Sequence, residues 1–167
     1  MTETRDGFTF FWRPDSPFSQ WHPARFTVDG NGFVCAEQYM MHGKAVLFGD
    51  AAIAAEILAA TEPRAHKALG RKVRGFDDAT WKKNREAIVY AGSRAKFTQN
   101  PALRAVLLAT AGTRLVEASP MDRIWGIGMT AANKDATNPA KWRGQNLLGQ
   151  ILTRLRDDLI AEGKLTR

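Results

Sequence analysis

The chain has 167 residues, a net charge of +7 and an average globular composition, with 44% hydrophobic and 25% charged residues. These values exclude a disordered or fibrous chain and predict one domain with a sizeable core. No apolar run reaches the ~20 residues that cross a bilayer, and the start MTETRDG lacks the apolar core of a signal peptide. We therefore expect a cytoplasmic protein without a membrane partner.

The first third of the chain is predicted to form short strands and turns. Residues 8–37 are rich in aromatic and β-branched residues and are interrupted by Pro and by the turn sequence Asp29-Gly30-Asn31-Gly32. ARFTV and GFVCA flank this turn, which predicts an antiparallel hairpin.

The pattern becomes helical from about Ala36. Further helices are expected over residues 51–60 after a cap at Asp50, over 63–70, over about 78–99 after a cap at Asp77 or Asp78, and from 101 to near 112. RLVEAS and RIWGIG are predicted to be short extended pieces, and residues 128–145 a loop long enough to suggest function. Apolar residues at helical spacing between 148 and 159 predict a final helix ending near Gly163.

These elements predict a single α+β domain over residues 1–167. It should be mainly α-helical, with a small antiparallel β-ribbon or sheet formed largely by the N-terminal third. The one cysteine, Cys35, cannot form an internal disulfide, which fits a reducing compartment.

The segment VCAEQYMMHGKAVLFGD carries one acid, Glu37, and one lysine, Lys44, in a nearly apolar helix. Seven residues separate them, so both lie on one helical face and are able to meet one ligand. Burial raises the pKa of a carboxyl and lowers that of an ammonium, which suits proton transfer or, for lysine, nucleophilic attack. The alternative is an internal ion pair, or two charged groups at the edge of the core.

A basic stretch suggests a phosphate-bearing partner. Residues 62–96 carry ten Lys or Arg against four Asp or Glu. Within it, Trp81 lies beside Lys82, Lys83 and Arg85, which predicts either a base-stacking basic patch or a helix anchored to the core by its tryptophan.

Metal and cofactor motifs are weak. GIGMTA at 126–131 superficially fits a dinucleotide fingerprint but lacks the acid that should follow it, and no histidine or cysteine pair has metal-ligand spacing. We expect neither a metal nor a cofactor, while a Cys/His nucleophile stays open because such partners meet only in space. Trp125, Gly126 and Gly128 suggest an aromatic wall beside backbone that a ligand approaches, or a core tryptophan with turn glycines.

Several motifs occur in the order and at the spacing typical of one family. They are FFWRPDSPFSQW, AEQYMMHGKAVLFGD, LGRKVRGF, W-x3-R, SRAKFTQNP, LLAT, LVEASPMDRIWGIG and WRGQNLLGQILTRLR. Over residues 8 to 160 the chain resembles the NADAR superfamily, also called YbiA-like.

The resemblance implies a compact, mainly helical α+β domain with N-glycosidase activity on ribosides whose nitrogen is an exocyclic amine. Implied substrates are the phosphoribosylaminopyrimidine intermediates of riboflavin synthesis and ADP-ribosylated guanine in nucleic acid, whose ADP-ribosylation the enzyme would reverse. Glu37 and Lys44 match the family's acid and lysine and are the predicted catalytic residues. The predicted substrate-binding residues are Trp12, Arg71, Trp81, Lys96, Asp122, Trp125, Gly126, Gly128 and Asn146.

The chain also departs from the family pattern. The serine and histidine that flank the family acid are Ala36 and Gln38 here, and Ile127 stands where some members carry an acid after Trp-Gly. Substrate choice in those members is therefore not carried over. Asp122 is the nearest remaining acid.

Our hypothesis is that Glu37 shuttles protons and that Lys44 is either a Schiff-base nucleophile or a cation that holds the sugar or phosphate. Arg71, Lys96 and the helix start near Asn146 would bind phosphate, and Trp81 and Trp125 would stack on the base. The alternatives are a non-catalytic module that binds ADP-ribose or nucleic acid, and a structural or adaptor protein. The sequence predicts neither the oligomeric state nor whether DNA or RNA is bound.

Overall fold

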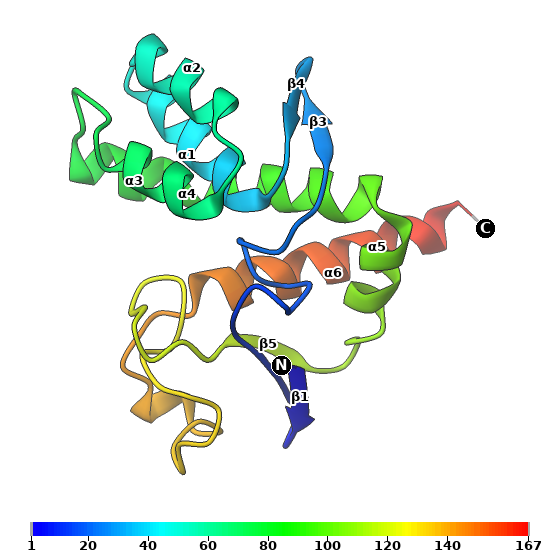
Figure 1. Cartoon of the computed structure of the whole chain (residues 1–167). Helices are drawn as coiled ribbons and strands as arrows, with labels where there is room; N and C mark the ends of the chain where they lie inside the picture. Colours follow the sequence, from blue (N-terminus) through cyan, green and yellow to red (C-terminus); the bar gives the residue numbers. More distant parts are fainter. Residues whose placement is uncertain (1, 167) are drawn as a thin grey trace. The chain divides into compact units, whose positions relative to one another are not determined.

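The computed structural model describes residues 2–166, which divide into two compact units. The sheet unit combines residues 2–19 and 102–166, and the helical unit is the continuous segment Gln20–Pro101 (Figure 1). The chain is mainly helical with small β-sheets, as predicted. A single domain over residues 1–167 stays a prediction.

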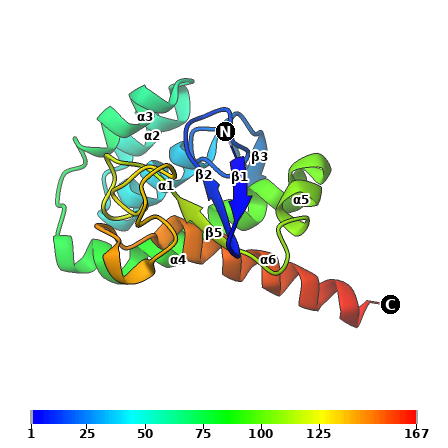
Figure 2. The same cartoon turned by 90° about the horizontal axis from the view of Figure 1, so that it is seen from below.

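The sheet unit is built on a three-stranded sheet in the order β1-β2-β5. Strand β1 (Thr2–Arg5) pairs antiparallel with β2 (Phe8–Phe11), and β2 pairs parallel with β5 (Arg114–Glu117). The three strands lie side by side, and α6 (Leu147–Leu165) packs along β5 (Figure 2). The sheet is thus completed by a parallel strand from the second half of the chain.

The prediction of a short extended piece at RIWGIG (residues 123–128) is wrong. Residues 121–128 form bends, because the Asp122 carboxylate accepts hydrogen bonds from the backbone N–H of Ile124 and of Trp125, both at 2.8 Å. Such a side-chain bond curls the backbone and competes with strand formation. The following loop runs to Asn146 and contains the short 3₁₀ helix η1 (Pro139–Lys141), in line with the predicted loop.

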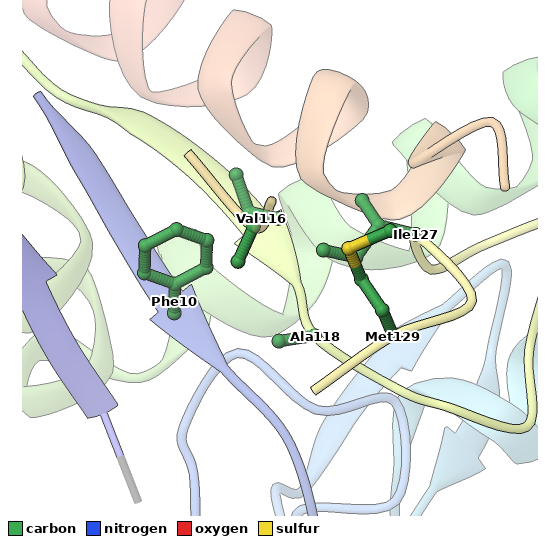
Figure 3. Packing of buried hydrophobic residues seen from close by; sticks show 6 residues of the cluster. Phe10, Val116, Ala118, Ile127 and Met129 are labelled. Carbon is green, nitrogen blue, oxygen red and sulfur yellow. The ribbon is translucent and has the colours of Figure 1, made fainter. Parts of the chain in front are cut away.

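An apolar cluster forms part of the core of the sheet unit. Phe10 from β2 and Val116 from β5 meet Ile127 and Met129 from the loop, each with at most 3% of its surface exposed (Figure 3). Burial of this cluster fixes the loop after β5 on the sheet, since each fully buried side chain contributes about 1.5–3 kcal/mol.

The helical unit begins with a hairpin of β3 (Phe26–Val28) and β4 (Asn31–Phe33) and continues as helices, as predicted (Figure 1). The helices are α1 (Ala36–Leu47), α2 (Ala51–Ala59), α3 (Pro63–Gly70) and α4 (Asp78–Gln99), and α5 (Pro101–Leu108) starts where the helical unit ends. Asp50 caps α2 by accepting from Ile53 N–H, and Asp77 caps α4 by accepting from Thr80 N–H.

Helix α1 packs against α2, α3 and α4, and glycines allow a close approach to two of them. A Cβ atom on Gly70 of α3 would overlap Met41 Sδ, and one on Gly92 of α4 would overlap the Tyr39 ring. Protein interiors have few voids into which such overlaps could relax. The helix that carries Glu37 and Lys44 is therefore held with little clearance.

Gln38, at the position where the NADAR superfamily that the chain resembles has a histidine, connects α1 to the end of α2. Its side chain is 1% exposed; Oε1 accepts from Val34 N–H at 2.8 Å, and Nε2 donates to the carbonyls of Ile57 at 3.0 Å and Ala60 at 3.2 Å. The amide of Gln38 is thus engaged with the backbone of its own unit.

Replacing Gln38 by leucine is expected to lower the free energy of unfolding by about 2–4 kcal/mol, because it leaves buried backbone groups without hydrogen bonds. Urea unfolding followed by circular dichroism measures this. Gln99→Leu is the matched control, since Gln99 makes two similar bonds to Thr27 at the exposed surface. Equal losses in the two variants would contradict the prediction.

Candidate functional site in the helical unit

Glu37 and Lys44 both lie on α1, as predicted. Glu37 is 5% exposed and its backbone N–H donates to the Gln20 carbonyl at 2.9 Å, while Lys44 is half-buried. The acid therefore occupies the buried start of the helix and the lysine its more open last turn. Their seven-residue spacing keeps them on one face, about 10.5 Å apart along the axis.

Lys44 is surrounded by aromatic rings and one cation. Its Nζ lies 4.7 Å from the ring centre of Phe76 and 5.8 Å from that of Trp81. Burial, and then the charge of Arg71 at the end of α3, lower the pKa of the Lys44 ammonium. A lowered pKa increases the share of neutral amine, the form that attacks a carbonyl or imine carbon.

A second buried charged group, the Lys96 ammonium on α4, acts on Cys35 at the start of α1. Lys96 on α4 is 1% exposed, and burial lowers its pKa to about 7. Burial is also the main cause that raises the pKa of the Cys35 thiol to about 11; the charge of Glu37 adds to this rise and that of Lys96 opposes it. Because the charges of Glu37 and Lys96 both act on the Cys35 thiol, these two side chains lie in its surroundings.

Cys35 meets a histidine, but the pair is not an activated nucleophile. Cys35 Sγ lies 3.6 Å from His66 Nδ1, and His66 Nε2 lies 2.8 Å from the Ala60 carbonyl. A carbonyl accepts only, so Nε2 carries the proton, and Nδ1 accepts from the neutral thiol. The raised thiol pKa is the opposite of what nucleophilic cysteines show.

Iodoacetamide at pH 8 is expected to alkylate native Cys35 about 100-fold more slowly than an ordinary thiol, because a pKa raised from 9.0 to about 11 lowers the thiolate fraction by about that factor. Burial slows the reaction further. Mass spectrometry over time measures the rate, with the urea-unfolded chain as control. Equally fast labelling of the native chain would restore the cysteine nucleophile.

In the sheet unit, the predicted residue Trp12 lines a cavity of about 550 Å³ together with Phe10, Arg13 and Thr130. The Arg13 guanidinium lies 4.7 Å from the Trp12 ring centre. This stacked pair presents a flat aromatic and cationic surface to the cavity.

The turn at Asp122 positions Trp125, because the Asp122 carboxylate binds the N–H of that residue. A Cβ atom on Gly126 would lie 2.9 Å from the Glu117 carbonyl oxygen, and Gly128 has φ +68°. The chain's own backbone therefore requires both glycines. Their approach to a ligand stays a prediction.

Asn146, at the start of α6, is fully buried. Its side chain accepts from Glu117 N–H at 3.0 Å and donates to the Leu115 carbonyl at 3.1 Å, so it connects β5 to α6. Its predicted contact with phosphate is not tested by this geometry. Ile127, at the position where some family members carry an acid, is 0% exposed in the apolar cluster of the sheet unit (Figure 3).

The sequence reasoning missed two features beside the predicted residues of the helical unit: Phe76, which contacts Lys44, and the ion pair between Asp50 at the cap of α2 and Arg74 in the loop before Phe76. The motif LGRKVRGF contained Arg74 and Phe76, but nothing in its spacing indicated these contacts. Among residues 2–166, no three His, Cys, Asp or Glu side chains gather as metal ligands. Nor does that stretch contain a helix with the length and hydropathy to cross a membrane.

Comparison with known proteins identifies the class. Residues 10–160 match the model of the NADAR domain. The chain therefore belongs to the NADAR domain family, and it is a hydrolase of the N-glycosidase class.

Its relatives share most of its length. N-glycosidase R617 of Acanthamoeba polyphaga mimivirus is 45% identical over 146 residues, which cover 84% of this chain and 86% of the relative. N-glycosidase YbiA of Escherichia coli K12 is 33% identical over 147 residues, 88% and 81% of the two chains. The NMR structure of E. coli YbiA superposes with a TM-score of 0.80 at 30% identity, covering 99% of this chain and 91% of YbiA.

A plant protein matches over a smaller share. The riboflavin biosynthesis protein PYRR of Zea mays is 33% identical over 112 residues, which are 65% of this chain and 16% of the maize protein.

Proposed function

We propose that this N-glycosidase hydrolyses ribosides attached through an exocyclic amine. The candidate substrates are phosphoribosylaminopyrimidine intermediates of riboflavin synthesis and ADP-ribosylated guanine in nucleic acid. The observation that carries the proposal is a buried acid and a lysine of lowered pKa on one face of α1. The name of the maize relative supports the first substrate class, and the net charge of +7 suits either phosphate-bearing class.

The proposed reaction begins at the glycosylamine nitrogen. Its lone pair forms a C=N bond to ribose C1 as the bond from C1 to the ring oxygen breaks, and protonated Glu37 gives the ring oxygen a proton. Neutral Lys44 then adds to C1, and Glu37 carries one proton from the lysine nitrogen to the base nitrogen. The bond between C1 and the base nitrogen breaks, which releases the base and leaves a Schiff base on Lys44.

Water completes the cycle. It adds to C1 of the Schiff base, the C1–Nζ bond breaks, and Glu37 takes the proton that is released. The products are the free base and an open-chain ribose, and both side chains return to their starting forms. One carboxyl group suffices here, whereas conventional glycosidases use two.

Other residues of the helical unit would bind the rest of the substrate. Arg71, exposed at the end of α3, is suited to a phosphate, and Trp81 to stacking on the base. Lys96 is closed to solvent, so its part in phosphate binding requires a ligand that reaches the start of α1.

The test is base release. The pure protein is incubated with a phosphoribosylaminopyrimidine and, separately, with an oligonucleotide carrying ADP-ribosylated guanine, and free base and sugar are quantified by mass spectrometry. Release from one of them that depends on Glu37 and Lys44 supports the proposal. Tight binding without release would favour a binding module, and no effect of either substitution would favour a structural protein.

A further inference from the structure

The loop between α3 and α4 brings a solvent-exposed phenylalanine onto the predicted catalytic lysine. Phe76 is 46% exposed, so its ring is open to solvent on one side. Its ring centre lies closer to Lys44 Nζ (4.7 Å) than that of Trp81 (5.8 Å), and Phe48 packs edge-on against it at 5.4 Å between ring centres. Phe76 therefore has a supported position beside the amine.

A buried carboxylate holds the loop that carries Phe76. The Asp50 side chain, 1% exposed, accepts from Arg74 N–H at 2.9 Å, from Arg74 Nε at 3.1 Å and from Arg74 Nη2 at 2.8 Å. We call this arrangement the Asp50–Arg74 clasp. These bonds keep the pKa of the Asp50 carboxyl well below its usual range, so the clasp stays charged at neutral pH and is lost only as the pH falls into the acid range.

The clasp fixes the backbone one residue before a turn. Gly75 has φ +77°, a conformation that L side chains rarely adopt, and it directs the chain from Arg74 to Phe76. Residue 74 is thus fixed by main-chain and side-chain bonds, and residue 76 is fixed by Phe48. The loop has no need of a ligand to place the ring.

We propose that Phe76 is a positioning residue for Lys44, and that the Asp50–Arg74 clasp holds Phe76 in place. The inference rests on the proposed function, in which Lys44 acts on ribose C1. A ring face attracts the ammonium form and restricts the flexible side chain to one orientation. Once Lys44 loses its proton this attraction ends, and the neutral amine is released to attack.

The elements beside Lys44 carry other charges that bear on the test. They are Arg71 at the end of α3, Arg74 in the loop with its partner Asp50 at the cap of α2, Asp77 at the cap of α4 and the Asp78–Lys82 pair at the start of α4. Of these, Arg71 lowers the pKa of Lys44, in addition to burial. Substitutions at Phe76 leave all of these groups in place.

The direction of a pKa change separates positioning by the ring face from simple shielding. Phe76→Leu keeps an apolar side chain but removes the ring, so loss of the cation–π contact moves the pKa of Lys44 down. If Phe76 only kept water away, the same substitution would admit water and move that pKa up. Phe76→Trp keeps an aromatic face at this position, so it should leave the pKa of Lys44 close to that of the unmodified chain.

The experiment measures how the reactivity of the Lys44 amine depends on pH in the absence of substrate. The chain is treated with pyridoxal phosphate and then borohydride at a series of pH values, and modification of Lys44 is quantified by peptide mass mapping. We expect the midpoint for Phe76→Leu to lie at lower pH, with labelling at neutral pH about two- to tenfold faster, and Phe76→Trp to match the unmodified chain. Val46→Leu, an exposed change on the same helix, is the control.

Turnover gives the second readout. In Phe76→Leu, kcat should fall about three- to tenfold with little change in KM, and Phe76→Trp should recover it. Arg74→Gln, which loosens the clasp but keeps the α2 cap, should also lower kcat. An unchanged or raised midpoint for Phe76→Leu, or kcat equal to that of the unmodified chain, overturns the proposal. A downward midpoint in a chain that releases no base from any substrate would instead overturn the proposed function.

Discussion

Replacement of Glu37 by glutamine is expected to lower base release by about 10²–10⁴-fold while the fold is retained. General acid–base catalysis contributes an effect of this size, and glutamine keeps the volume of the side chain but cannot exchange a proton. Because Glu37 is 5% exposed, an amide is also no harder to bury than a carboxylate at this position. The measurement is kcat for release of the base under saturating substrate.

Glu86→Gln is the matched control, since Glu86 is an exposed acid on α4. The thiol of Cys35 gives an independent check that the charge was removed, because the charge of Glu37 raises its pKa and the glutamine variant should lower it. A variant that shows this thiol change yet keeps full kcat would exclude Glu37 as the proton carrier.

Replacement of Lys44 by methionine is expected to reduce base release at least about 10³-fold, and by arginine to nearly the same degree. Methionine removes the amine, and arginine keeps a cation for the rings of Phe76 and Trp81 but does not lose its proton near neutral pH. Both substitutions remove the amine that a nucleophilic role needs, whereas arginine keeps the positive charge that a purely electrostatic role needs. The ratio of the two rates therefore separates the two roles.

Borohydride added during turnover provides direct evidence, because it reduces a Schiff base to a stable secondary amine. A ribose adduct mapped to Lys44 supports the nucleophile, and Lys83→Met, an exposed change on α4, should trap it normally. An actively releasing enzyme with no adduct, together with an arginine variant within about tenfold of the unmodified rate, would assign Lys44 the electrostatic role.

The helices of the helical unit were predictable because their signals are local. Asp50 and Asp77 each lie one residue before the helix that they cap, and Pro63 begins α3. The parallel pairing of β2 with β5 joins segments about a hundred residues apart, and no pattern within either strand encodes it. RIWGIG was misassigned because the side chain of Asp122, and not the hydropathy of the segment, decides its backbone.

The burial of Glu37 was predictable from the apolar run around it, while the surroundings of Lys44 were not. Phe76 reaches Lys44 only because the loop from α3 turns at Gly75 and is held by Asp50. These contacts depend on three-dimensional packing between α1, α2 and that loop. The bonds from the Asn146 amide to β5 were not predictable either, because they join residues about thirty positions apart, and the predicted phosphate contact of Asn146 stays a prediction.

The small clearance around α1 bears on how substrate preference changes in such a chain. A side chain at residue 70 or 92 meets Met41 or Tyr39, so the helix is not free to rotate or slide in order to admit a larger base. If the proposed site is correct, we expect substrate preference to change through segments that border α1, of which residues 71–77 supply Arg71 and Phe76 beside Lys44. Libraries that randomise the exposed residues 71 and 72, and leave Gly70, Gly92, Phe76 and the Asp50–Arg74 clasp unchanged, are the economical route to altered specificity.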